Sequence, residues 1–469
     1  MSPTNQKGPG LFQAVRDAIR GDTHRDFTEE SIGRAITLLA IPMVLEMTME
    51  SLFAVVDMFW VAHLGSDAVA TVGLTESVLT LLFAVAMGLS VATTAMVARR
   101  IGEKNPKAAA EVATQSVLLG LIVAGASGIA GGIFAPQLLH VMGASDSIVR
   151  TGSGYTRVIY GGSSSVMLLF LINAVFRGAG DAALAMRVLW IANLINILLN
   201  PLLIFGLGPF PKLGVLGSGV GTTIGRSCGV LLQLWMLTAG KSRVIVRAHQ
   251  FRLQPELMLR LIRLSLGGMF QYFVGVASWI GLVRMAAAFG SVAVAGYTLA
   301  IRIIIFAILP SWGMANAAAT LVGQNLGARK PDRAEKSVWR AGFYNMVFLA
   351  LVAVTFVAFA VPLVSVFTKD AGVVPVAASA LRLISYGYVF YAWGMVIVQA
   401  FNGAGDTYTP TVINIICHWA WQIPLAWFLS FRANLGPNGV FLAIAIAESS
   451  VAVLAILAFR RGKWKEQII

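Results

Sequence analysis

The sequence predicts an all-α integral membrane protein in which twelve transmembrane helices form two pseudo-symmetric six-helix bundles, an N-lobe and a C-lobe. Three observations lead to this prediction: an apolar composition, a series of long apolar blocks, and a repeat that relates the two halves of the chain. Hydrophobic residues make up 57% of the 469 residues, and charged residues only 12%. Because about a quarter of a soluble chain is normally charged, this composition excludes an ordinary soluble protein.

Twelve apolar blocks supply the predicted helices in chain order. A helix needs roughly 20 residues to cross the hydrocarbon core of a bilayer, and the blocks have about this length or more. Both cysteines, Cys228 and Cys417, lie inside blocks, so no disulfide framework is expected. The blocks are residues 36–63, 72–98, 110–134, 156–176, 186–206, 214–238, 259–289, 294–322, 340–367, 383–401, 410–430 and 439–459.

The net charge of +14 is explained by membrane topology. Most Lys and Arg residues lie in the two terminal segments and in alternate connections between blocks, which is the pattern of the positive-inside rule. We therefore expect a multi-pass protein of the plasma (inner) membrane with both termini in the cytoplasm. The lipid bilayer is its expected surroundings, and no nucleic acid is expected as a partner.

Residues of the first half match residues of the second half that lie a constant number of positions later in the chain. The six residues 176–181 (FRGAGD) then meet residues 401–406 (FNGAGD). Six helices in each copy mean that both copies enter the membrane from the same side, as in transporters that rock two halves around a central site. Further pairs under this shift are Gly65 with Gly290, Gly88 with Gly313, Gly102 with Gly327, Pro106 with Pro331, Phe134 with Phe359, and Gly214 with Gly439.

The repeat and the charges divide the chain into five segments. We expect a cytoplasmic N-terminal segment (1–32), the N-lobe (33–240), a basic cytoplasmic linker (241–257), the C-lobe (258–460) and a cytoplasmic tail (461–469).

The first predicted helix carries three acids, Glu46, Glu50 and Asp57. At about 100° per residue, Glu50 and Asp57 lie roughly 40° and 20° from Glu46, so all three share one face. Ionisable groups inside membrane helices are unfavourable and mark functional sites by default. The alternative for Glu46 and Asp57 is that each lies near enough to a helix end to be hydrated.

The fifth and sixth predicted helices carry neutral oxygen ligands. Asn196 and Asn200 are four residues apart on one face, and Thr222 follows a glycine-rich entry to the next helix. Together with Asp57 they form a hard-oxygen set that suits an alkali cation, or a carboxylate that takes up a proton. The alternative is that Asn and Thr only join helices to one another, which is common in membranes.

The repeat favours the cation site. Under the shift, the counterparts of Asp57, Asn196, Asn200 and Thr222 are Leu282, Trp421, Leu425 and Ala447, all apolar. Polar residues that only join helices would more often occur in both halves, so we expect the cation site in the N-lobe alone.

The C-lobe offers candidates for a substrate cavity, to which Glu46 and Glu50 are added from the N-lobe. Arg284 is a counter-ion or a lining charge, unless its long side chain reaches a nearby membrane surface. Trp393 can line a pocket for flat organic molecules or face lipid, and His418 is either a ligand or a satisfied interior residue. No P-loop, HExxH motif, CxxC motif or nucleophile elbow occurs, so no enzyme and no cofactor beyond a coupling ion is expected.

These residues resemble the MATE (multidrug and toxic compound extrusion) family over residues 33–460. The resemblance is carried by Pro42, the run 56–61 (VDMFWV), Leu64-Gly65 and the two GAGD runs. It implies secondary antiport of organic, often cationic, compounds against Na⁺ or H⁺ by alternating access of two lobes.

The resemblance also assigns site residues. It places the cation site of the N-lobe at Asp57, Asn196, Asn200 and Thr222, with Na⁺ as a candidate ligand. Some members carry Asp where this chain has Asn200. One branch uses a Glu and an Asp in the C-lobe, and those positions are Gly275 and Tyr391 here, which argues against a C-lobe site of that kind.

The sequence therefore favours a monomeric antiporter that exports small organic molecules in exchange for H⁺ or Na⁺. A dedicated flippase or exporter of a single lipid-linked or native metabolite is the first alternative. A membrane receptor or scaffold is the second, and the acids of the first helix argue against it.

Overall fold

The structure, a computed structural model, describes residues 11–21, 25–247 and 250–469, and all regular elements in this part of the chain are helices. The predicted N-terminal segment therefore lies partly outside the described residues, at 1–10 and 22–24. The elements up to the linker are α1 (Leu11–Arg20), α2 (Ile32–Ala62), α3 (Ser66–Gly102), α4 (Pro106–Val141), α5 (Asp146–Gly161), α6 (Ser163–Ala179), α7 (Ala182–Phe205) and α8 (Val215–Thr238). The elements after it are α9 (Pro255–Ala287), α10 (Ser291–Gly327), α11 (Pro331–Ser365), α12 (Val373–Ser385), α13 (Tyr388–Ala404), α14 (Tyr408–Asn414), the π-helical η2 (Ile415–Gln422), α15 (Ile423–Trp427), the π-helical η3 (Phe428–Arg432), α16 (Pro437–Arg460) and the 3₁₀ turn η4 (Lys463–Glu466).

The predicted all-α membrane architecture is confirmed. Within the described residues, 10 helical segments are long and apolar enough to span a membrane, and the bent pair α12–α13, with 60° between its helices, makes 11. The segments α5–α6 and α14–η3 each count as one span. The remaining predicted block is α8, which has 24 residues and packs along α7.

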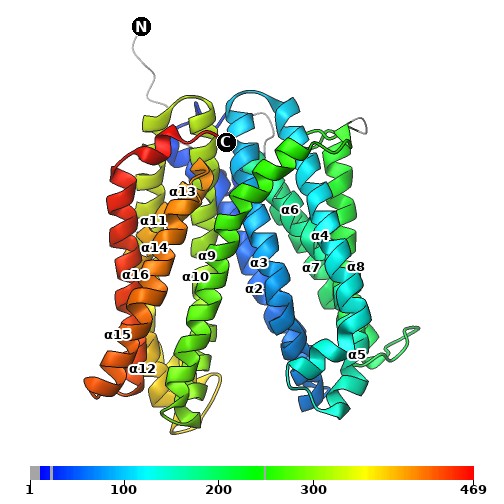
Figure 1. Cartoon of the computed structure of the whole chain (residues 1–469), viewed down its shortest axis with the longest axis vertical. Coiled ribbons are helices and arrows are strands. Elements are labelled where there is room, and N and C mark those ends of the chain that lie inside the picture. Colours follow the sequence, from blue (N-terminus) through cyan, green and yellow to red (C-terminus); the bar gives the residue numbers. More distant parts are fainter. Residues whose placement is uncertain (1–10, 22–24, 248–249) are drawn as a thin grey trace.

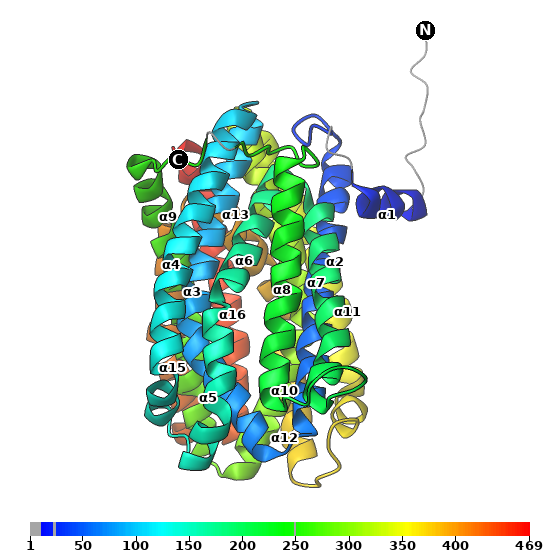
Figure 2. The same ribbon diagram turned by 90° about the vertical axis from the view of Figure 1, so that its right-hand side faces the viewer.

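The helices form two bundles that meet at one end and diverge at the other (Figure 1). Helices α2 to α8 lie on one side and α9 to α16 on the other, and a perpendicular view shows the same long helices running in one common direction (Figure 2). The beginning of α2 and the C-terminus lie at the end where the bundles meet. The residue limits predicted for the two lobes stay predictions. Below, N-lobe denotes the bundle α2 to α8 and C-lobe the bundle α9 to α16.

Two crossings at equivalent glycines bring the lobes together. A Cβ on Gly88 of α3 would lie 2.5 Å from the carbonyl oxygen of Ser265 in α9. A Cβ on Gly313 of α10 would lie 2.6 Å from the backbone nitrogen of Val44 in α2. Only glycine allows such close backbone approach. The repeat therefore generates two similar contacts, α3 on α9 and α10 on α2.

Backbone geometry repeats between the lobes at the predicted interval. Glycine at a positive φ caps the start of α3 and of α10, and the kinks of α4 and α11 fall at equivalent phenylalanines shortly before a proline. The matching pairs are Gly65 (φ 99°) with Gly290 (97°), Lys104 (57°) with Arg329 (57°), Gly180 (87°) with Gly405 (90°), and the kinks at Phe134 with Phe359.

The repeat changes register before α16. A constant shift pairs Gly214 with Gly439, but the residue that caps α16 with the same conformation is Gly436 (φ 58°, ψ −140°, against 58° and −136° at Gly214). The π-helical segments η2 and η3 add residues to their span, because a π-helix contains more residues per turn than an α-helix. The connection that follows is shorter than the one before α8. The structural counterpart of Thr222 is therefore Ile444 rather than Ala447, and that of Arg226 is Glu448.

The C-terminal tail joins the two lobes at their contact end. Trp464 is buried and stacks on Phe459 of α16, with 4.6 Å between ring centroids. Beyond it, the carbonyl oxygen of Gln467 accepts a hydrogen bond from Arg99 of α3, and that of Ile469 accepts one from Arg100 at 3.2 Å.

Candidate cation and substrate site

Three helices of the N-lobe meet at the carboxylate of Asp57. Its Oδ1 accepts a hydrogen bond from Asn200 Nδ2 of α7 at 2.6 Å and another from Ser218 Oγ of α8 at 3.0 Å. Asp57 itself lies in the last third of α2 and is half-buried. Two donors on one oxygen hold the carboxylate in a fixed orientation and stabilise its ionised form.

A second pair lies one helical turn away. Asn196 is four residues before Asn200, and its Nδ2 donates to Thr222 Oγ1 of α8 at 2.8 Å. The Oδ1 atoms of Asn196 and Asn200 are both buried and have no hydrogen-bond partner. A buried oxygen without a donor is unfavourable unless another group or ion satisfies it. The site therefore offers a carboxylate and two unsatisfied neutral oxygens.

Small residues of α8 let these groups approach. A Cβ on Gly221 would lie 2.2 Å from Asn200 Oδ1, and a Cβ on Gly225 would lie 2.7 Å from the carbonyl oxygen of Ala192. Both glycines lie on the face of α8 that packs along α7. Glycine at this spacing is typical of close helix pairs in membranes.

The structure thus brings together all four predicted cation ligands, as two directly bonded pairs. The prediction missed Ser218, whose only signal is its position one turn before Thr222. It also missed Glu76, an exposed residue of α3 inside the apolar block 72–98. The charges of Asp57, Arg226 and Arg302 act on Glu76, so it belongs to the same region. The role of the four residues in cation binding stays a prediction.

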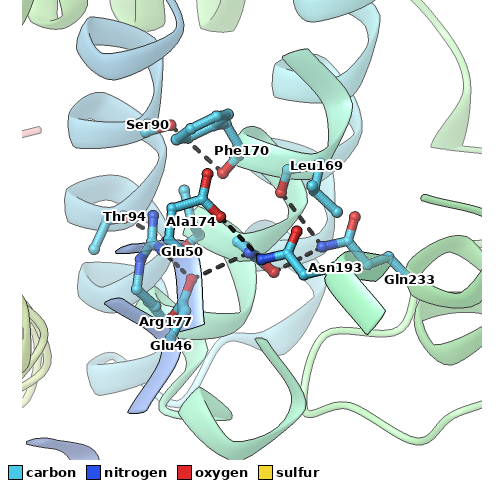
Figure 3. A network of polar contacts seen from close by, with 11 residues as sticks. Glu46, Glu50, Ser90, Thr94, Leu169, Phe170, Ala174, Arg177, Asn193 and Gln233 are labelled. Atoms are coloured by element: carbon cyan, nitrogen blue, oxygen red, sulfur yellow. Dashed lines mark hydrogen bonds and ion pairs between the residues drawn. The ribbon is translucent and has the colours of Figure 1, made fainter. Parts of the chain in front are cut away.

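Glu46 is not hydrated but buried in an ion pair inside the N-lobe. Its Oε1 accepts from Arg177 Nη1 of α6 at 2.8 Å and from Asn173 Nδ2 at 3.1 Å, and the residue is 1% exposed (Figure 3). The Oδ1 of Asn173 in turn accepts from Gln233 of α8 at 2.7 Å. A carboxylate this deeply buried needs its cation, so the structure does not place Glu46 at a cavity surface.

Glu50 lies between these two clusters. It is half-buried and accepts a hydrogen bond from Asn193 Nδ2 of α7 at 3.3 Å (Figure 3). The same helix pair thus makes two similar contacts, Asn193 with Glu50 and Asn200 with Asp57. Glu50 keeps its place as a candidate lining residue.

The C-lobe candidates do not form one site. Arg284 is exposed near the end of α9. Trp393 packs between α13 and α11, 5.5 Å from the ring of Trp339, so it fills a helix interface. His418 lies 3.3 Å from Glu448 of α16.

The C-lobe positions that the MATE resemblance singles out carry no carboxylate. A Cβ on Gly275 would meet no atom within 4 Å, and Tyr391 packs partly buried among apolar side chains. Among the described residues no three His, Cys, Asp or Glu side chains cluster as metal ligands would. The predicted cation site around Asp57 therefore stays the candidate.

Comparison with known proteins agrees with the fold and with the repeat. A family model described as MatE matches residues 42–202 and again residues 269–428, once in each lobe. The probable multidrug resistance protein YoeA of Bacillus subtilis is 26% identical over 452 residues, which cover 94% of this chain and 96% of that protein. The FAD transporter of Shewanella oneidensis is 24% identical over 416 residues, covering 88% and 91%.

Solved structures match over nearly the whole chain. The outward-facing conformation of a multidrug resistance MATE family transporter of the MOP superfamily aligns with a TM-score of 0.87 and 27% identity, over 97% of this chain and 99% of that one. The protein is thus a multi-pass membrane transporter of the multidrug-resistance type and not an enzyme. With the family model covering most of both lobes, the chain belongs to the MATE family of transporters.

Proposed function

We propose that this MATE transporter is a secondary active antiporter that exports organic compounds in exchange for H⁺ or Na⁺. The observation that carries the proposal is the Asp57 cluster, in which one carboxylate takes donors from two other helices beside two unpartnered amide oxygens. An ionisable group inside a membrane domain is energetically unfavourable, so its presence there favours a role in transport. The cation is a transported substrate of the protein.

Both coupling ions suit the residues. Hard cations prefer oxygen ligands, and Asn196, Asn200 and Thr222 supply neutral oxygens beside the charge of Asp57. A proton on Asp57 would instead remove the charge and leave the carboxyl group able to donate. In either case, binding neutralises a carboxylate that joins α2 to α7 and α8.

Alternating access is supported by the way the lobes meet. Their close crossings at Gly88 and Gly313 lie toward the end that carries the termini, whereas the bundles diverge at the Asp57 end of α2. If both termini are cytoplasmic, as the charge pattern predicts, this is an outward-open arrangement. Cation binding can shift the equilibrium toward one arrangement only through a difference in affinity between the two.

The proposed substrates are lipophilic organic cations. The half-buried Glu50 and the exposed Glu76 supply negative charge on N-lobe helices near Asp57. The similarity to a probable multidrug resistance protein favours such compounds. We further propose that the chain works as a monomer in the plasma (inner) membrane, with lobes 33–240 and 258–460 as the moving units.

Efflux of ethidium, a fluorescent organic cation, from proteoliposomes tests the proposal. An imposed Na⁺ gradient and, separately, an imposed proton gradient would drive the wild-type protein and the Asp57→Asn variant. We expect efflux under one of the gradients, which identifies the coupling ion, and its loss in the variant. Asp67→Asn is the matched control, because Asp67 is exposed at the start of α3 and its carboxylate accepts a hydrogen bond from Ser147 in the neighbouring α5, away from the Asp57 cluster.

Normal efflux by the Asp57→Asn variant would refute the role of Asp57 in coupling. Absence of efflux under both gradients, from protein shown to be folded, would refute the broad substrate range and favour a dedicated exporter.

A dedicated exporter of one anionic metabolite is the second candidate, and basic residues favour it. Arg226 of α8 lies over the ring of Phe53 at 5.8 Å, and its charge acts on Asp57 and Glu76. The similarity to an FAD transporter agrees with an anionic substrate. Uptake of FAD into inside-out vesicles, abolished by Arg226→Gln and unaffected by ethidium, would establish this function in place of the first.

A further inference from the structure

A second ionisable pair lies in the C-lobe, apart from the Asp57 cluster. Nε2 of His418 in η2 is 3.3 Å from Oε1 of Glu448 in α16, and the two side chains are 15% and 24% exposed. His418 lies near the middle of the span Tyr408–Arg432, and Glu448 near the middle of Pro437–Arg460. Both groups are therefore close to the midplane of the predicted membrane domain.

The hydrogen-bond partners of His418 point to a proton between its imidazole and the carboxyl group of Glu448. Nδ1 of His418 is 3.1 Å from the carbonyl oxygen of Asn414, which can only accept, so this contact is a hydrogen bond in the tautomer that carries its hydrogen on Nδ1. In a neutral imidazole, Nε2 then has a lone pair, and an ionised carboxylate also offers only lone pairs. The contact between Nε2 and Glu448 is a hydrogen bond only if one more proton lies between them. On the imidazole, which is the more basic of the two groups, that proton makes an imidazolium–carboxylate ion pair.

Loss of this proton changes the interaction between the side chains of His418 and Glu448 from favourable to unfavourable. With the proton, the pair has no net charge and a satisfied hydrogen bond. Without it, two lone pairs face each other and a single negative charge remains in a largely apolar interior. Glu448 lies on the buried stripe of α16 that includes Ile444 and Val451, so few polar groups are available to compensate.

We propose that His418 and Glu448 form a proton-binding site of the C-lobe, which holds one exchangeable proton between the imidazole and the carboxylate. The existence of this proton site does not depend on the proposed antiport. Only its role in transport rests on that proposed function.

Few other ionisable groups face the pair. Tyr391 of α13 and Cys417 of η2 lie close enough for the charge of Glu448 to act on them. The basic groups of the neighbouring elements are engaged elsewhere, since Arg382 of α12 donates to the carbonyl oxygen of Val357 and Arg432 of η3 lies over the ring of Trp427. Helix α9 faces η2 with the neutral Ser278, and its Arg284 is exposed near the far end of that helix.

The site is linked to the helix that contacts the N-lobe. Ser278 of α9 donates to the carbonyl oxygen of His418 at 3.3 Å, or to Gln422 Oε1 at 2.8 Å. The indole of Trp419 donates to the carbonyl oxygen of Val274 in α9 at 3.1 Å. Helix α9 in turn packs on α3 at Gly88. A change of charge at His418 therefore acts on a segment that is bonded to a helix of the lobe interface.

The C-lobe site is not a copy of the N-lobe site. The structural counterpart of Glu448 is Arg226, a cation near Asp57, so the charge at this position is reversed between the lobes. His418 lies in a π-helical segment, whereas α7, which carries Asn196 and Asn200, is a regular α-helix. Short π-helical segments are rare and frequently occur at functional sites.

Magnetic resonance of the full chain in lipid bilayers with isotope-labelled histidine tests the proposal directly. The chain has 5 histidines, so the ring-nitrogen signals of His418 can be assigned by their loss in His418→Gln. Between about pH 5 and about pH 9 we expect these signals to change from an imidazolium to a neutral ring. In Glu448→Gln the midpoint should fall by at least about one pH unit, because an opposite charge nearby favours the imidazolium form.

A second histidine–acid contact provides the matched control. Nε2 of His140 lies 3.9 Å from Asp146, but these side chains are 54% and 84% exposed. Asp146→Asn removes a histidine–acid contact that water screens, and it should leave the His418 signals as they are in the wild-type protein. A His418 midpoint that Glu448→Gln moves by much less than one pH unit would overturn the proposal, as would a His418 signal that does not change with pH. If His418→Gln does not fold, the signal displaced by Glu448→Gln identifies His418 instead.

Transport gives an independent measurement. In proteoliposomes, His418→Gln should alter the pH dependence of ethidium efflux while the loss caused by Asp57→Asn persists. An unchanged pH profile would contradict a role of the C-lobe proton in transport. If Asp57→Asn exported normally, the proposed antiport would fail, but the titration of His418 would still decide whether the proton site exists.

Discussion

Arg177 of α6 donates from Nη1 to Oε1 of Glu46 across 2.8 Å, and both side chains are buried among the helices of the N-lobe. The backbone oxygen of the same arginine accepts a hydrogen bond from Thr320 Oγ1 of α10 at 3.0 Å. One residue therefore neutralises a buried acid within the N-lobe and contacts the C-lobe.

Removing only the arginine should destabilise the protein strongly. Arg177→Met leaves Glu46 buried without a cation, which costs about 3 to 5 kcal/mol. The double variant Glu46→Leu, Arg177→Met should recover most of this loss, because two apolar residues can replace a buried ion pair. Thermal unfolding in detergent measures both. Equal destabilisation of the single and double variants would show that buried Glu46 does not need the charge of Arg177.

The hydroxyl of Ser218 should tune the coupling of Asp57. It donates to Oδ1 at 3.0 Å and so stabilises the ionised carboxylate. If the coupling ion is H⁺, Ser218→Ala should raise the pH of half-maximal efflux by about one unit, because a hydrogen bond to a charged group contributes about 1.5 to 3 kcal/mol. Ser218→Thr keeps the hydroxyl and should keep the wild-type profile. A downward shift, or equal behaviour of the two variants, would contradict this contact.

A single methyl group on α8 should disrupt the cation site. The Cβ of Gly221→Ala would lie 2.2 Å from Asn200 Oδ1, so the amide must move, and its hydrogen bond to Asp57 is disturbed. We expect a lower melting temperature and loss of gradient-driven efflux. Gly125→Ala in α4 is the control, since its Cβ would meet no atom within 4 Å. Similar effects of the two variants would indicate a general intolerance of helix glycines instead.

The C-terminal tail should favour the arrangement in which the lobes meet at the terminal end. Deletion of residues 467–469 removes the carbonyl oxygens that accept from Arg99 and Arg100. Spin-label distances between the ends of α4 and α11 on that side should become longer or more broadly distributed. Ile468→Ala is the control, because this side chain is 95% exposed. Unchanged distances after the deletion would show that the tail does not stabilise the contact between the lobes.

The membrane fold and the Asp57 site were predictable for the same physical reason. Long apolar blocks and polar groups within them have few explanations in a lipid environment, so Asp57, Asn196 and Asn200 stand out. The spacing of Asn196 and Asn200 also placed them on one helix face, and the structure bonds Asn200 to Asp57 as a shared site requires.

Partners distant in sequence were not predictable. Arg177 directly follows the predicted block 156–176, but it lies within α6 and pairs with Glu46. No local pattern marks such a pair. Ser218 was missed because serine is common in close-packed membrane helices with or without a function.

The alignment of α16 with α8 in the internal repeat could not be predicted from the sequence either. The shorter connection before α16 outweighs the residues added by η2 and η3, and under the unchanged interval Gly214 still meets a glycine, Gly439. A constant shift therefore looked valid to the end of the chain, and the reversed charge of Arg226 and Glu448 stayed hidden.

The glycine crossings lie toward one end of the two bundles, so a small rotation of a lobe about them would move its far end by a much larger distance. About 22 residues of α3 lie between its start and Gly88, which at 1.5 Å per residue is an arm of about 33 Å. A rotation of about 10° at the crossing would then displace the far end of the helix by about 6 Å, close to the diameter of a small aromatic ring with its hydrogens. Under the proposed alternating access, small changes in packing at Gly88 and Gly313 would therefore change the width of the opening between the lobes by about the size of a transported molecule, without contact to the substrate.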